Sequence, residues 1–152
     1  MFIIVKMHVK NQETAKEILT IQLLAYKIEA EIICFDGIPP LKETIDEIIY
    51  SDETYLGYIE NGVLIGFLSY IKKRDSFQIS KLVVDPSHFR RGIAKRLLEY
   101  FINKVTKGSL VIVSTGAKNE PAKRLYKLFG FVEFEDIEVA PDVFITSMKF
   151  VP

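Results

Sequence analysis

The segment from Leu82 to Leu98 constrains the fold of this chain more than any other. An apolar strand ends at Asp85-Pro86, and a basic helix with a glycine in its first turn follows from Arg90. Such a turn directs free backbone N–H groups and the positive end of the helix dipole toward one point, where anions bind. The sequence therefore predicts a strand–turn–helix unit with an anion site at the turn.

The charges at this turn favour an anion site over a plain surface helix. Arg90, Arg91, Lys95 and Arg96 crowd the helix start, where each cation opposes the dipole by about 0.3–1 kcal/mol. Gly92 keeps the backbone open, and the arginines can add charge-assisted contacts to phosphate. No G-x-G-x-x-G follows a strand and no G-x-x-x-x-G-K-[ST] occurs, which argues against dinucleotide oxidoreductases and P-loop NTPases.

Length and composition predict a single cytoplasmic domain covering residues 1–152. The formal net charge is zero, so no overall field attracts nucleic acid or acidic membranes. Cys34 is the only cysteine, which excludes an internal disulfide and suits a reducing compartment. No apolar run reaches the roughly 20 residues of a membrane span, and the N-terminus does not read as a signal peptide.

Hydrophobic periodicity and turn residues predict a mixed, mostly antiparallel sheet flanked by helices, of the α/β (α+β) class. Asn61-Gly62 is a strong hairpin signal, and the apolar run Leu82-Val83-Val84 indicates a buried or bulged strand end. The expected order is β-α-α-β-β-β-α-β-α-β-β. The predicted strands are Phe2–Met7, Tyr55–Ile59, Val63–Ile71, Phe77–Val84, Ser109–Val113, Val132–Val139 and Val143–Val151; the predicted helices are Asn11–Ile33, Leu41–Ile49, Arg90–Val105 and Asn119–Gly130.

Two motifs resemble those of the GNAT superfamily of N-acyltransferases. Leu82-Val83-Val84-Asp85-Pro86 with Arg90-Arg91-Gly92-Ile93-Ala94 resembles its acyl-CoA-binding motif, and Asn119-Glu120-Pro121-Ala122 with Leu125-Tyr126 resembles the motif that follows. Their order and spacing also match, as does the element order over nearly the whole chain. The resemblance implies a GNAT-like fold and acetyl-CoA as the cosubstrate.

By this resemblance, the backbone amides of the helix start hold the coenzyme A pyrophosphate, and the strand before it pairs with the pantetheine arm. Phe89 is a departure, because the family commonly has Gln or Arg at this position. The implied cofactor-binding residues are Leu82, Val83, Val84, Arg90, Arg91, Gly92, Ile93, Ala94, Lys95, Asn119 and Tyr126.

Tyr126 is the implied general acid. It shares a helical stripe with Asn119 and Lys123, and an amphipathic boundary tyrosine is the alternative interpretation. The resemblance favours catalysis, since a tyrosine at this position commonly protonates the departing CoA thiolate. With reference pKa values of about 10 for phenol and about 8.5 for thiol, that transfer costs a couple of kcal/mol.

The general base is open in the sequence. Some family members have a Glu on the strand before the CoA motif, where this chain has Ser80 and Lys81. Glu29 and Glu31 on the first helix are alternatives, and Asp36 is a weaker one. Tyr26 and Glu29, one turn apart, could present an aromatic face and a carboxylate to a cationic acceptor; a solvated Glu on a helix flank is the competing interpretation.

The predicted function is an N-acetyltransferase in which a small-molecule or protein amine attacks the thioester directly. An N–H of Val83 or Val84 would polarise the carbonyl. Cys34 has no evident His partner, so no acyl-enzyme is expected, and His8 and His88 have no spacing that suggests a metal. The alternatives are a non-catalytic acyl-CoA-binding or regulatory module and, less consistent with the zero net charge, a nucleic-acid binder. Pairing of C-terminal strands makes a homodimer conceivable.

Overall fold

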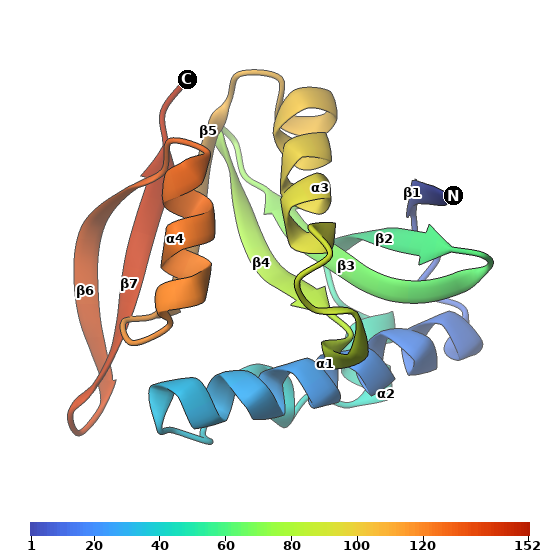
Figure 1. Cartoon of the computed structure of the whole chain (residues 1–152), viewed down its shortest axis with the longest axis horizontal. Coiled ribbons are helices and arrows are strands. Elements are labelled where there is room, and N and C mark those ends of the chain that lie inside the picture. Colours follow the sequence, from blue (N-terminus) through green and yellow to red (C-terminus); the bar gives the residue numbers. More distant parts are fainter.

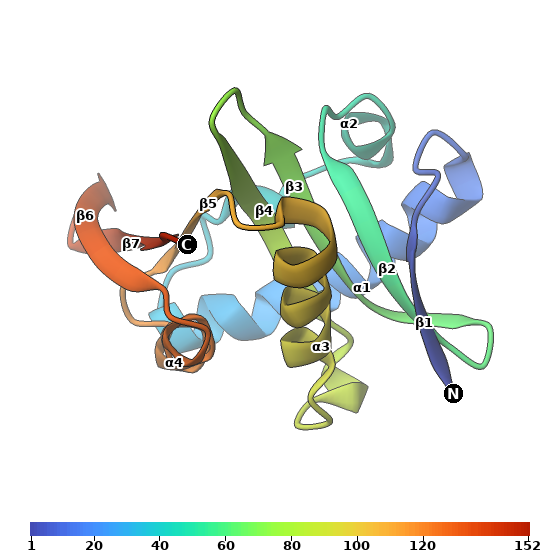
Figure 2. The same ribbon diagram turned by 90° about the horizontal axis from the view of Figure 1, so that it is seen from above.

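The computed structural model describes all 152 residues, in which helices cover both faces of one seven-stranded sheet (Figure 1). α3 and α4 lie on one face, and α1 runs across the other (Figures 1 and 2). The strands are β1 Phe2–Lys6, β2 Thr54–Glu60, β3 Val63–Lys72, β4 Ser76–Val84, β5 Leu110–Gly116, β6 Val132–Ala140 and β7 Val143–Phe150. The α-helices are α1 Gln12–Ile33, α2 Ile45–Ile49, α3 Ile93–Tyr100 and α4 Glu120–Leu128. The predicted fold class and element order are confirmed.

The sheet has the order β1-β2-β3-β4-β5-β7-β6, and only β4 and β5 run parallel. The expected meander of β2, β3 and β4 is confirmed, as is its first turn: Asn61 and Gly62 both have positive φ. This is the backbone conformation that a tight two-residue hairpin requires. β5 runs three residues beyond the predicted end because Ser114, Thr115 and Gly116 continue to pair with β7.

The end of β4, before the predicted anion site, is covered by helices on both faces and follows a bulge. Ser69 pairs with Lys81 and Tyr70 with Ile79, so Ser80 has no partner on β3. The bulge therefore precedes the Leu82-Val83-Val84 run, so of the two predicted explanations, a buried or a bulged strand end, the buried one is confirmed. Val83 is buried in the core on the α1 face, whereas Leu82 and Val84 pack on the α3 face. Both faces of the strand end are thus covered by helices.

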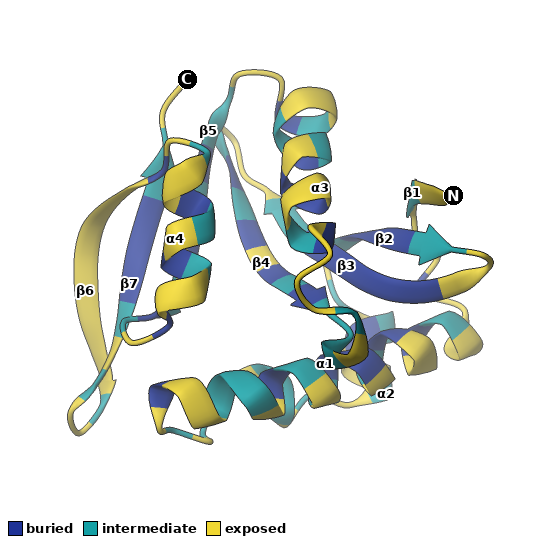
Figure 3. Ribbon diagram, viewed as in Figure 1, coloured by how far each residue is buried: buried dark blue, intermediate teal, exposed yellow.

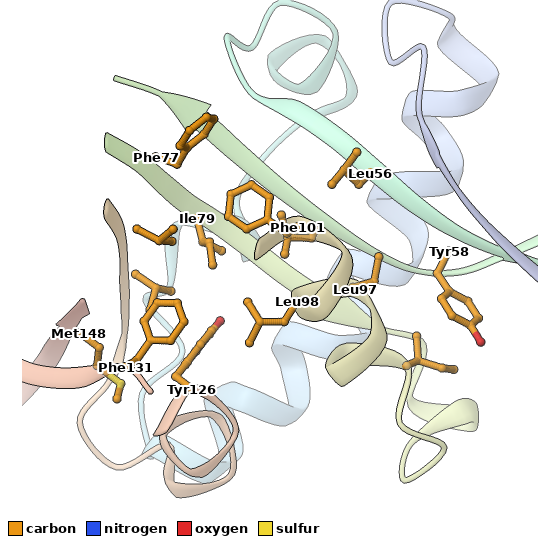
Figure 4. Close-up of a cluster of buried hydrophobic side chains, with 14 of the residues drawn as sticks. Leu56, Tyr58, Phe77, Ile79, Leu97, Leu98, Phe101, Tyr126, Phe131 and Met148 are labelled. Carbon is orange, nitrogen blue, oxygen red and sulfur yellow. The ribbon is translucent and has the colours of Figure 1, made fainter. Parts of the chain in front are cut away.

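The two faces of the sheet carry separate hydrophobic cores. The core under α3 and α4 includes Leu97, Phe101, Tyr126 and Phe131 (Figure 4). The core under α1 and α2 includes Ile18, Ile48, Tyr55 and Phe67. The helices on each face of the sheet are thus held in place by a core of their own.

No helix of the chain combines the length and the apolar composition that crossing a membrane requires.

Two predicted helix boundaries are wrong for local backbone reasons. The helix expected from Arg90 begins at Ile93, because Arg90 and Gly92 adopt left-handed conformations (φ 65° and 75°) that no right-handed helix contains. Its last part, Phe101–Thr106, is a π-helix. The helix expected at Leu41–Ile49 divides into a 3₁₀ turn, Pro39–Leu41, and α2, which starts at a capping box formed by Thr44 and Glu47.

Candidate active site

β4 and β5 separate into a V directly after the bulge. Their last paired residues are Ile79 and Val113, and beyond them β4 pairs only with β3 and β5 only with β7. The Asp85 N–H donates to the Ile65 carbonyl. In an antiparallel ladder such hydrogen-bonded pairs alternate with non-bonded ones, so the peptide groups of Val83 face β3. Those of Leu82 and Val84 face the opening between β4 and β5.

The turn into α3 presents unpaired amides at the mouth of this V. Gly92 is the N-cap of α3 and no side chain caps the helix, so the amides of Ile93, Ala94 and Lys95 lack intrahelical partners. The left-handed residues Arg90 and Gly92 curve the backbone into a concave nest of N–H groups, the geometry of many phosphate sites. The buried Ile93 side chain anchors the turn to the core.

Arg91 in the turn and Arg96 in α3 both bind residues of β2. Arg91 donates twice to the Glu60 carboxylate at the end of β2, at 2.8 and 2.9 Å. Arg96 donates to the Tyr58 hydroxyl and lies 5.1 Å from the centre of the Phe2 ring. Arg91, expected from the sequence to contact phosphate, therefore holds the turn against β2. The side chains of Arg90 and Lys95 are exposed and have no ion-pair partner in the structure.

Tyr126 lies on α4 beside the opening. Its ring packs 5.3 Å from that of Phe131, and its hydroxyl points toward Leu98 on α3 (Figure 4). Burial, and secondarily the negative charge of Glu29, raises the pKa of Tyr126 well above the usual value for a phenol. The hydroxyl is therefore held in its protonated form, which is the form that a general acid requires.

Glu29, on α1, is joined to α4 through Asn119. Asn119 Nδ2 donates to Glu29 Oε1 at 3.0 Å, and Asn119 Oδ1 accepts the Ala122 N–H as the N-cap of α4. All the polar atoms of Asn119 thus have partners inside the protein, and its side chain joins α4 to α1. Burial raises the pKa of Glu29, and the Asn119 hydrogen bond lowers it by a smaller amount.

Tyr26 is near two groups of polar residues, Glu29 with Tyr126 and Glu43 with Glu53. Burial raises its pKa most, and Glu29, Tyr126, Glu53 and Glu43 raise it further, in that order. The structure therefore brings Tyr26, Glu29 and Tyr126 together, although Tyr126 is 100 residues along the chain from Tyr26. Glu31 and Asp36, the other acidic candidates, line a separate depression beside Cys34.

The second polar group, in which Lys81 lies beside Glu43 and Glu53, was not predicted from the sequence. Lys81 is 6% exposed, forms an ion pair with Glu43, lies 3.6 Å from Glu53, and donates to the Tyr55 hydroxyl at 2.9 Å. Ser69 donates to Glu53 at 2.6 Å. The only sign of this group in the sequence was the polar pair Ser80-Lys81 within an otherwise apolar strand. Glu43 and Glu53 belong to other segments, so no spacing linked them to Lys81.

Comparisons with known proteins agree with this geometry. The acetyltransferase (GNAT) family model matches residues 21–131. The UPF0157 protein YqkA of Bacillus subtilis is 39% identical over 143 residues, which are 94% of this chain and 42% of that protein. This chain therefore spans less than half the length of that relative.

Solved structures share the fold at low sequence identity. The ribosomal-protein-S18-alanine N-acetyltransferase of Escherichia coli matches with a TM-score of 0.78 and 19% identity, covering 98% of this chain and 92% of that one. The PaiA N-acetyltransferase of Thermoplasma acidophilum, solved in complex with coenzyme A, matches with a TM-score of 0.73 and 20% identity, covering 99% of both chains. The family match extends over β2 to β5, the turn into α3 and the Tyr126 helix, and on that basis the chain belongs to the GNAT family of acetyltransferases.

Proposed function

We propose that this chain transfers an acetyl group from acetyl-CoA to a primary amine. The observation that carries the proposal is the V between β4 and β5, with uncapped α3 amides at its mouth and a protonated Tyr126 beside it. Free amides in a nest suit a diphosphate, and unpaired strand edges suit an extended amide-containing arm that adds to a sheet. The solved complex of a structural neighbour with coenzyme A supports this choice of cosubstrate.

The proposed reaction is direct attack of a neutral amine on the thioester carbonyl. A C–N bond forms, the C–S bond breaks, the amine loses one proton and the CoA thiolate gains one. We assign carbonyl polarisation to the Val84 N–H rather than to Val83, because the peptide groups of Val83 face β3. Donors placed in this way contribute about 10²–10³ in kcat.

Tyr126 is the proposed acid and Glu29 the proposed base. Burial raises the pKa of the phenol, and the same exclusion of water disfavours the thiolate, so the proton still has a basic acceptor when the C–S bond breaks. Burial also raises the pKa of Glu29, which makes its carboxylate a stronger base. An amine with a pKa of about 10.4 must lose its proton before attack, at a cost of about 4–5 kcal/mol at pH 7.

The experiment that tests the proposal measures binding and turnover separately. Calorimetry with coenzyme A should show heat, and release of free CoA thiol from acetyl-CoA should depend on added amine. Binding without turnover against a broad amine panel would favour the non-catalytic module instead. Binding of oligonucleotides in competition with coenzyme A would favour the nucleic-acid alternative.

We further propose a cytoplasmic homodimer that associates through β6. All but the last residue of β6 are exposed (Figure 3), although Val132, Phe134, Ile137 and Val139 are large apolar residues. β6 is also an outer strand of the sheet, and an exposed apolar edge strand favours pairing with another chain. The exposed free thiol of Cys34 suits a reducing compartment.

A further inference from the structure

A depression of about 510 Å³ opens on the α1 side of the sheet, beside the second polar group. None of its lining residues is hydrophobic, and its charged ones are Lys42, Glu43, Glu47, Glu53 and Lys81. Three carboxylates therefore face two ammonium groups, which leaves one negative charge unbalanced. A wall of this composition is poorly suited to an apolar or anionic ligand and well suited to a cation.

The wall of the depression is a built site rather than a group of surface acids. Lys81 is held at the wall with its side chain 5% exposed. Gln22 is fully buried, and its Nε2 donates to the Pro40 carbonyl at 3.0 Å and to Glu43 Oε1 at 2.8 Å. Its carbonyl Oε1 has no partner and is closed off from solvent. Gln22 therefore lies behind the wall and fixes Glu43 Oε1 from the buried side.

Glu43 has the acceptor capacity for such a cation. Both of its hydrogen bonds, from Gln22 and from Lys81, arrive at Oε1. No hydrogen bond reaches its Oε2, and the side chain is 17% exposed to the depression. Lys81 itself demonstrates that an ammonium group fits among Glu43, Glu53 and the Tyr55 hydroxyl.

The depression lies within reach of the reacting centre. Lys81 directly precedes Leu82 on β4, and Val84 lies three residues further, about 10 Å along an extended strand. The peptide groups of Leu82 and Val84 face the V between β4 and β5. Tyr26 is close enough to Glu43 and Glu53 at the depression, and to Tyr126 at the V, for these groups to raise its pKa. A chain of about seven carbons holds two nitrogens about 10 Å apart and so spans this separation.

We infer that the acceptor is an aliphatic amine with a second cationic group, and that Glu43 binds this second cation while the first amine reacts. The inference rests on the proposed acetyl transfer and specifies its substrate class. The distal ammonium would donate to Glu43 Oε2 beside Lys81. A neutral or anionic group at the same position would leave a carboxylate unpaired in a partly buried wall.

The test is calorimetric titration of the CoA-saturated protein with 1,7-diaminoheptane, heptylamine and 7-amino-1-heptanol. We expect the diamine to bind at least tenfold more tightly than either monoamine, and Glu43→Gln to remove this difference. Glu17→Gln, the same change on an exposed part of α1, should preserve it. Equal binding of all three amines to the unmodified protein would overturn the inference.

Lys81→Met provides a variant with the opposite expected effect. Removing the resident ammonium frees Glu43 and Glu53 for the diamine, so diamine affinity should rise several-fold while heptylamine affinity stays constant. A merely structural role of the cluster predicts loss of affinity for both amines, and that result would contradict the inference.

Turnover distinguishes this inference from the proposed function. Selective binding of the diamine with no CoA release would overturn acetyl transfer and leave the cation site standing. Acetylation of heptylamine and 1,7-diaminoheptane with equal kcat/KM would establish acetyl transfer and refute the cation site.

Discussion

Asn119 Nδ2 donates to Glu29 Oε1 at 3.0 Å, across 90 residues of sequence. This hydrogen bond fixes α4, which carries Tyr126, against α1, which carries Tyr26 and Glu29. The proposed acid and base therefore depend on the packing of two helices from opposite ends of the chain. The same side chain also caps α4, because its Oδ1 accepts the Ala122 N–H. These two roles together account for an asparagine at this position.

Tyr126→Phe should lower kcat by about 10²–10⁴ without changing the affinity for coenzyme A, because only the proposed proton donor is removed. The ring contact with Phe131 is retained, so the melting temperature should change little. Steady-state kinetics and a thermal melt check both points. An unchanged kcat would show that the proton comes from elsewhere. Phe131→Leu, which leaves the hydroxyl in place, serves as the packing control.

Glu29→Gln should lower kcat most strongly at neutral pH and remove the low-pH limb of the rate profile. Because burial raises the pKa of Glu29, the wild-type rate should rise as pH increases through that raised pKa. Gln retains a carbonyl that can accept from Asn119. A pH–rate profile that is identical in the two proteins would exclude Glu29 as the base.

Glu29→Gln should raise the free energy of unfolding, although it lowers kcat. A carboxyl with a raised pKa in the folded state binds its proton more tightly than in the unfolded state, so its contribution to the free energy of unfolding falls as pH rises through this range. Glu29→Gln should therefore gain stability relative to wild type as pH rises from the ordinary pKa of a glutamate through the raised pKa of Glu29. Urea denaturation at several pH values measures the difference, and a relative loss with rising pH would contradict it.

Glu60→Gln should weaken coenzyme A binding by about two- to tenfold, because the turn before α3 loses the anchor of Arg91 and must be ordered on binding. The Arg91 hydrogen bond lowers the pKa of Glu60, so this anchoring should be lost as pH falls through that lowered value. Calorimetry checks the affinity. Glu133→Gln removes a similar exposed ion pair with Lys127 (2.7 Å) on α4 and should leave binding unchanged; equal losses in both variants would argue against the anchor.

Gly92→Ala should reduce both stability and coenzyme A affinity. The new Cβ would meet no atom within 4 Å, so the cost is the left-handed backbone at φ 75° alone, about 1–2 kcal/mol for a residue with a side chain. Gly62→Ala at φ 80°, also in open space, should cost the same stability with no effect on coenzyme A. If the two variants bound coenzyme A equally well, the nest at Gly92 would not be the phosphate site.

Local signals in the sequence were enough for most of the fold. The strand–turn–helix unit at residues 82–98, the Asn61-Gly62 hairpin and the Asn119 cap each depend on a few adjacent residues, and the structure has all three elements. The helix start was misplaced by three residues, since a left-handed Arg90 has no signature in a basic run. The apolar run Leu82-Val83-Val84 left a buried and a bulged strand end open, because pairing with β3, not composition, decides that the residue without a partner is Ser80.

The sequence by itself determined the element order, the uncapped glycine turn and the residues that identify the family, because these follow from local backbone preferences and hydrophobic periodicity. The tertiary structure alone decided which polar groups meet: Glu29 with Asn119, Arg91 with Glu60, and Lys81 with Glu43 and Glu53. Their separations along the chain range from 28 to 90 residues. Contacts of that kind are created by the packing of the two cores against one sheet, and no repeat or spacing in the chain encodes them.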